Sequence, residues 1–227
     1  MFDITWIDLI CLAAVKGRDI ESVRQVIGAE NEPSSGDDAR FNSVTPPEGA
    51  MLSEWGDGVL VCQLGSGTRC AKPQTLAALA TARGTVMATC WHDRGISPAY
   101  PGWHNLLALA ANGRLLSALD PSNHQQQRLG YDTSALDPYL AGARFDYETI
   151  PVWSPAGETI GYGAGGSIVV AHWRYACLLA IERFMQAELR ESVVRSVVPG
   201  RSFFLSGSLP ESPVPIPEFL NYSPGGD

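Results

Sequence analysis

The dipeptide Asn112-Gly113 separates two apolar runs, and it constrains the fold more than any other feature of this sequence. The segment around it reads HNLLALAANGRLLSALD. Asn and Gly both tolerate the positive φ that a type I′ turn requires, so the segment predicts a two-residue β-hairpin. Counting outward from the turn gives the expected cross-strand pairs: Ala111 with Arg114, Leu109 with Leu116, and Leu107 with Ala118. Both faces of the hairpin are largely apolar, which indicates a sheet that is covered on both sides.

The composition is that of a globular protein with a sizeable core. The chain has 227 residues, of which 45% are hydrophobic and 18% are charged. A chain of this length buries about 70% of its unfolded surface, so we expect stability without disulfides or metals. The formal net charge is −8 and the basic residues form no run, which argues against nucleic-acid binding. No run approaches the roughly 18 apolar residues of a membrane span, so we expect no membrane partner.

The N-terminal part of the chain is expected to form a pair of short helices. Apolar residues recur at helical spacing over positions 4–14, and again over positions 20–27. Gly17 ends the first stripe, Asp19 suits the N-cap of the second, and Gly28 ends it. The opening residues MFDITWIDLI have no basic region, so they do not resemble a signal peptide.

The remaining chain predicts an α+β domain with a mainly antiparallel sheet. Strands are expected at 59–64 and 85–91, a packed helix begins at Pro73, and a short helix has Pro138 in its first turn. A long C-terminal helix is expected from Ser167 to Val198, where Pro199 closes it. We therefore expect a single α+β domain over residues 1–198, followed by a proline-rich, extended tail over residues 199–227.

Residues with possible chemistry gather in the stretch TVMATCWHDRGISPAYPGWHN. Side chains two apart on a strand share a face, so Cys90 and His92 are expected to point the same way, with His104 near the next strand. A thiol beside an imidazole is the arrangement of a nucleophilic cysteine, which leaves a cysteine-dependent hydrolase or transferase as one alternative. The other interpretation is that these residues only mark strand ends and a connecting loop, and we favour it. No catalytic residue is therefore assigned.

Metal and cofactor sites are not expected. A structural zinc site needs four ligands, often in a C-x₂-C pair, and the sequence has no such pair. A zinc-binding module on Cys90, His92 and His104 is a third alternative, which elemental analysis of the protein would test. The segment GYGAGG (Gly161–Gly166) matches the glycine spacing of a dinucleotide site, but the buried strand before it and the βαβ unit are missing. We interpret it as a flexible linker. The chain has 5 widely scattered cysteines, which are typical of small buried hydrophobic residues in a reducing cytoplasm.

The order of these modest motifs resembles a domain family that is found mainly in actinobacteria and has no assigned activity. The resemblance covers roughly Ile4 to Leu189. Its motifs are the helix with Trp6 and the segments VKGRDIESVRQVIGAE, WGDGVLVCQL, LAALATARGTVMATCW, NLLALAANGRLLSALDP, RLGYDTSALDPYL and HWRYACLLAIERFMQAEL. Thr133 and Ser134 stand where the family has a proline. The resemblance supports the α+β fold and implies no catalytic residue.

These observations favour a non-catalytic cytoplasmic protein-binding domain, of the immunity or regulatory kind. An acidic domain suits a basic protein partner through electrostatic steering. Aromatic residues in expected loops are the candidate interface anchors: Trp55, Tyr100, Trp103 and Trp153.

Overall fold

The computed structural model describes residues 9–30, 49–64, 69–81, 83–92, 103, 105–125, 127–151, 167–189 and 201–205. Its strands are β1 (Leu9–Lys16), β2 (Ala29–Glu30), β3 (Gly49–Trp55), β4 (Gly58–Leu64), β5 (Thr85–His92), β6 (Asn105–Ala111), β7 (Arg114–Leu119), β8 (Tyr147–Pro151), β9 (Ser167–Ala171) and β10 (Arg201–Leu205). Its helices are α1 (Ile20–Ile27), α2 (Pro73–Leu79), α3 (Asp137–Leu140) and α4 (His172–Met185), with 3₁₀ turns η1 (Arg69–Ala71) and η2 (Pro121–Asn123).

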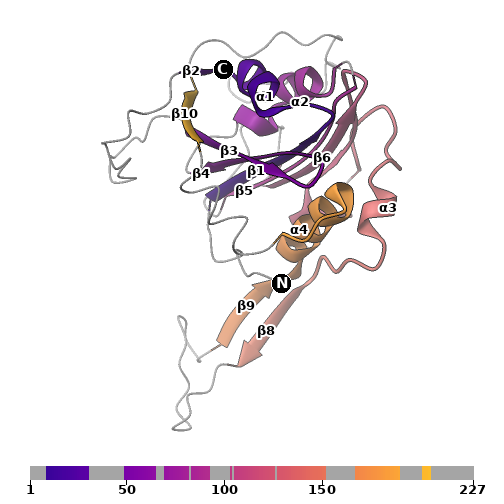
Figure 1. Ribbon diagram of the computed structural model, residues 1–227. Helices are drawn as coiled ribbons and strands as arrows, with labels where there is room; N and C mark the ends of the chain where they lie inside the picture. The colour runs from indigo at the N-terminus through magenta and orange to yellow at the C-terminus, as the bar shows by residue number, and fades with distance from the viewer. Residues whose placement is uncertain are drawn as a thin grey trace, which may run out of the picture.

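These elements form three layers, and the middle layer is an eight-stranded sheet. The strand order is β2-β10-β3-β4-β1-β5-β6-β7, and every neighbouring pair is antiparallel. Helices α1 and α2 cover one face of the sheet, and α4 lies against the other (Figure 1). Strands β8 and β9 form a separate two-stranded antiparallel sheet. The predicted α+β class and the mainly antiparallel sheet are confirmed.

Two hydrophobic cores lie on the two faces of the sheet. The α1–α2 core includes Ala13, Val15, Val23, Ile27, Leu76 and Leu79. The α3–α4 core includes Leu12, Leu60, Trp91, Leu107, Trp173 and Ile181. Every residue of β6 is buried, as the apolar faces of the predicted hairpin indicated.

The expected first helix of the N-terminal pair is wrong where the structure describes it, because residues 9–16 form β1. This strand lies between β4 and β5 and is buried on both faces, with Leu12 in one core and Ala13 in the other. A strand buried on both faces has no polar alternation, and its apolar run then resembles a helical stripe. Residues 1–8 lie outside the described part.

The second helix of the expected pair is confirmed as α1. Its predicted N-cap, Asp19, accepts a hydrogen bond from the backbone N–H of Ser22 at 2.7 Å. Its predicted stop, Gly28, has a φ of 67° and donates its N–H to the last turn. The local capping chemistry was therefore enough to place this helix.

The Asn112-Gly113 hairpin is confirmed, with φ values of 53° and 71° at its two turn residues. Ala111 faces Arg114 as expected, but the other two predicted pairs are wrong. The register shifts after Ala110, so that Leu109 faces Ser117 and Leu107 faces Leu119. The extra residue is Leu116, which forms a β-bulge.

The bulge changes which leucines of β7 reach the core. It places Leu115 and Ala118 in the same α1–α2 core although they are three residues apart. The backbone carbonyl of Leu116 accepts a hydrogen bond from the N–H of Asp132 at 2.8 Å, and Ala118 pairs with Leu129. The segment after β7 therefore folds back along the outer edge of that strand.

The expected long C-terminal helix is wrong in its extent. Residues 167–171 form β9, and α4 begins at His172 and ends at Met185, before Gln186 in the left-handed conformation. The β-branched residues of SIVVA favour a strand over the first turn of a helix. Residues 190–200 lie outside the described part. Part of the predicted tail, residues 201–205, forms β10 inside the sheet.

The other expected elements agree with the structure. The predicted strands at 59–64 and 85–91 correspond to β4 and β5, and the packed helix from Pro73 is α2. The short helix with Pro138 in its first turn is α3. Among the helices described, none is long and apolar enough to cross a membrane.

Candidate functional site

Cys90 lies in the middle of the sheet and is buried. It belongs to β5, its exposed fraction is 3%, and its side chain is part of the α1–α2 core. Directly opposite on β1 stands Cys11, which is 1% exposed. Attack by a thiolate needs an accessible sulfur, so burial disfavours Cys90 as a nucleophile.

The neighbouring thiols support a packing role for these cysteines. A hydrogen bond with Cys90 and burial hold the pKa of Cys11 well above its usual range, and nearby Cys70 acts in the same direction. Burial raises the pKa of Cys62 and of Cys177 to about 12. All five thiols are reduced and buried. At neutral pH Cys11, Cys62 and Cys177 are therefore protonated, and a protonated thiol is a poor nucleophile and metal ligand.

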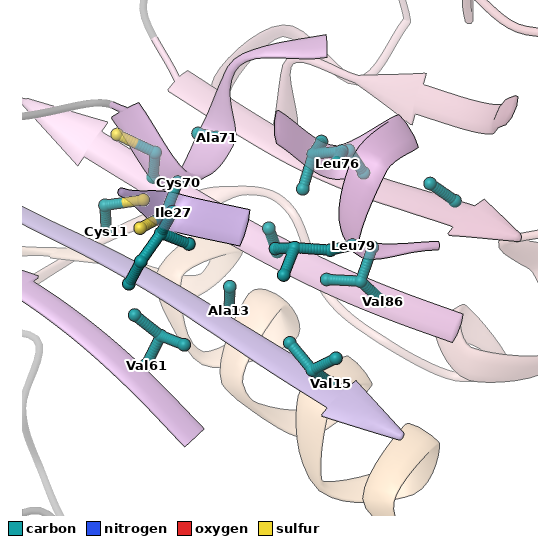
Figure 2. Close-up of a cluster of buried hydrophobic side chains, with 14 of the residues drawn as sticks. Cys11, Ala13, Val15, Ile27, Val61, Cys70, Ala71, Leu76, Leu79 and Val86 are labelled. Carbon is teal, nitrogen blue, oxygen red and sulfur yellow. The ribbon is translucent and has the colours of Figure 1, made fainter. Parts of the chain in front are cut away.

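A buried amide side chain, that of Gln63, lies next to the pair of Cys11 and Cys90 in the sheet. Gln63 on β4 faces Cys11, so Gln63, Cys11 and Cys90 follow one another across three strands. Its side-chain oxygen accepts a hydrogen bond from the backbone N–H of Cys70 at 3.2 Å, which fixes η1 over the sheet. Figure 2 shows Cys11 and Cys70 among the aliphatic side chains of the α1–α2 core. Cys11 and Cys70 are therefore surrounded by core side chains, and the side-chain amide of Gln63 holds η1 in place.

The two histidines of the expected site are only partly placed. His92 ends β5 opposite Leu9, and its side chain lies outside the described part. His104 also lies outside it. The predicted convergence of Cys90 with these histidines therefore stays a prediction. Among the described residues, no three His, Cys, Asp or Glu side chains are placed to hold a metal ion.

Two of the candidate anchors, Trp55 and Trp103, are buried, which disfavours them as interface anchors. Each is 6% exposed, because Trp55 is part of the α3–α4 core and Trp103 of the α1–α2 core. Large aromatic side chains bury much apolar area, and the two cores use them in that way. Tyr100 and Trp153 lie outside the described part, as does the Gly161–Gly166 segment.

The β8–β9 arm, defined as residues 147–151 and 167–171, is a surface feature that the sequence analysis missed. The arm extends past α4, away from the eight-stranded sheet (Figure 1). Within the described part of the chain, no third strand pairs with either of its outer edges. Unpaired strand edges are templates for adding another strand, so the arm is the strongest candidate binding element. The run of β-branched residues in SIVVA is the signal that predicts β9.

Side chains at the base of the arm attach it to α4. The indole Nε1–H of Trp173 donates a hydrogen bond to the hydroxyl of Tyr147 at 3.0 Å. Nε2 of His172 lies 2.8 Å from the carboxylate of Glu148, and the guanidinium of Arg144 lies 3.4 Å from the same carboxylate. The arm therefore meets α4 in a defined orientation.

The contact with His172, followed by the charge of Arg144, holds the pKa of Glu148 below its usual range. An ionised Glu148 therefore stabilises the fold above its unfolded pKa of about 4.3, and this contribution is lost as the pH falls through the lower folded value. We expect Glu148→Gln to lower the urea midpoint near neutral pH by a small, salt-sensitive amount, because the carboxylate is exposed. The difference between the variant and the wild type should shrink as the pH falls below about 4. A difference that does not change with pH would contradict the ion-pair explanation.

Comparisons with known proteins give no relatives. No family model, no curated protein and no solved structure matches the chain. The resemblance to the actinobacterial family thus stays a prediction, and the function must be argued from the residues themselves.

Proposed function

We propose that this chain is a non-catalytic cytoplasmic protein-binding domain that contacts its partner through the β8–β9 arm. The observation that carries the proposal is the arm itself, which has two outer edges without a strand partner among the described residues. A two-stranded ribbon is marginally stable in water, and added strands or packing against another surface stabilise it. A protein laid along one edge would supply both hydrogen bonds and apolar cover.

The placement of the cysteines supports binding over catalysis. Cys90 is 3% exposed and its neighbour Cys11 is 1% exposed, so neither sulfur is accessible to a substrate. The cysteine-dependent hydrolase or transferase needs the opposite arrangement, with a thiolate in an accessible position. An immunity-like or regulatory role is the finer form of the proposal, and the net charge of −8 supports it by favouring basic partners.

The proposal is tested by affinity capture from native lysate over a range of salt concentrations. The baits are the wild type, a double variant with proline at Thr149 and Val169 on the two arm strands, and Tyr131→Ala. Tyr131 is 52% exposed and lies outside the arm, so its variant is the matched surface control. We expect proteins that the wild type and Tyr131→Ala retain and the double variant loses. An identical set on all three baits, or no retained protein at any salt concentration, would overturn the proposal.

A further inference from the structure

One hydrogen bond at the base of the arm sets the direction of every backbone group along it. The N–H of His172 donates to the carbonyl of Asp146 at 3.0 Å, one residue beyond the pair of Tyr147 with Ala171. Hydrogen-bonded and non-hydrogen-bonded pairs alternate along an antiparallel ladder. The pair of Ile150 with Ile168 is therefore hydrogen-bonded, whereas the pair of Thr149 with Val169 is not. The backbone N–H and C=O groups of residues 147, 149, 167 and 169 point outward. At the ends of the strands the carbonyl of Pro151 and the N–H of Ala171 also point outward, whereas the carbonyl of Ala171, the N-cap of α4, accepts the first bond of that helix.

The two outer edges of the arm are not equivalent. On β8 one of the outward positions is Pro151, which has no N–H to give to an added strand. The same strand carries the charged residue Glu148. Proline and charge are the usual means of blocking a strand edge. On β9 the outward positions are Ser167, Val169 and Ala171, which all have an N–H, and the strand has no charged residue.

We propose that β9 pairs in antiparallel orientation with β9 of a second copy of this chain, centred on Val169. This proposal rests on the proposed function, because it assigns the β9 edge of the same arm to a second copy. In this register Val169 faces the second copy's Val169, and Ser167 faces the second copy's Ala171. The Val169 pair can exchange both of its hydrogen bonds, and in each pair of Ser167 with Ala171 the N–H of Ala171 can donate to the carbonyl of Ser167. The strand is self-complementary.

The side chains of β9 also suit pairing with a second copy. Ile168 would face the second copy's Val170, so β-branched residues meet across the new ladder and no like charges are opposed. The twofold arrangement closes on itself and leaves β8, with its blocked edge, on the outside. The result is a four-stranded sheet in the order β8-β9-β9-β8. This exceeds the three strands that a small sheet needs for stability of its own.

The test is sedimentation equilibrium of the full chain from low to high micromolar concentration. We expect a reversible dimer for the wild type. Val169→Pro removes an outward N–H without removing a bond between β8 and β9, so self-association should weaken at least about tenfold, or 1.4 kcal/mol. Thr149→Pro is the matched control, because it makes the same change on the β8 edge, and it should dimerise like the wild type. A monomeric wild type, or equal behaviour of the two variants, would overturn the inference.

A second variant keeps the test independent of proline effects on folding. Val169→Lys places two like charges directly opposite each other at the twofold axis, so we expect weak association that high salt restores. Association at low salt as strong as that of the wild type would overturn the inference. A monomeric wild type that still captures another protein through its arm would overturn this inference alone. A chain that does neither would overturn the proposed function as well.

Discussion

Replacing Trp91 by alanine is expected to lower the free energy of unfolding by about 3–5 kcal/mol. Trp91 lies on β5 in the α3–α4 core, where it is 1% exposed. Its ring meets that of Trp173 edge-on, with 6.1 Å between the centroids. Loss of the indole opens a cavity between the sheet and α4, and it removes the aromatic pair as well. Urea denaturation should show a lower midpoint with an unchanged slope.

Trp91→Phe is the control for that prediction. It keeps an aromatic ring against Trp173 and leaves a smaller cavity, so it should cost clearly less than the alanine variant. A loss of less than about 1 kcal/mol for Trp91→Ala would show that this side chain is not packed as described.

Gly130→Ala is expected to cost about 2–4 kcal/mol, because its position combines two penalties. Gly130 has a φ of 132°, which side-chain-bearing residues rarely adopt. A Cβ there would lie 2.1 Å from the backbone oxygen of Leu116, the bulged residue of β7. That oxygen already accepts the hydrogen bond from the N–H of Asp132, so it cannot move away without breaking this bond between β7 and the segment that pairs along its edge. Urea denaturation measures the loss.

Gly142→Ala separates the two penalties. Gly142 also has a positive φ, 70°, but a Cβ there would have no neighbour within 4 Å. Its alanine variant should therefore show only the cost of the left-handed backbone, about 1 kcal/mol. Equal losses for the two variants would mean that contact with Leu116 contributes nothing.

Elements with local chemical signals were predictable from the sequence. The turn at Asn112-Gly113 needs two residues that accept positive φ, and α1 has both its cap residue Asp19 and its stop Gly28. Each signal lies within a few residues of the structure that it determines. The neighbouring residues in the sequence were therefore sufficient to predict the turn and α1.

Elements that depend on distant pairing were not predictable in the same way. Strand β1 is apolar on both faces because it lies between β4 and β5, and nothing in its own residues distinguishes it from a buried helix. The bulge at Leu116 depends on the later segment around Asp132, which pairs along the edge of β7. Strand β9 was not predicted, because its apolar run continues directly into α4 and was assigned to that helix.

For the candidate site too, local features were predictable from the sequence and long-range pairings were not. The sequence placed Cys90 on a strand, and β5 confirms that placement. It could not show that Cys11 lies opposite, because that pairing joins residues far apart in the chain. The outward direction of Val169 is also a property of the ladder between β8 and β9, and it requires the partner strand to be known.

The central claim is that the cysteines of this chain serve its cores and that the chain acts by binding. Alkylation of the native protein by iodoacetamide near neutral pH, followed by peptide mass spectrometry, tests it most directly. We expect Cys90 and Cys11 to be modified only as fast as the protein unfolds, because they are 3% and 1% exposed. Modification of Cys90 in the folded protein at the rate of a free thiol or faster would contradict the claim and favour a nucleophilic cysteine.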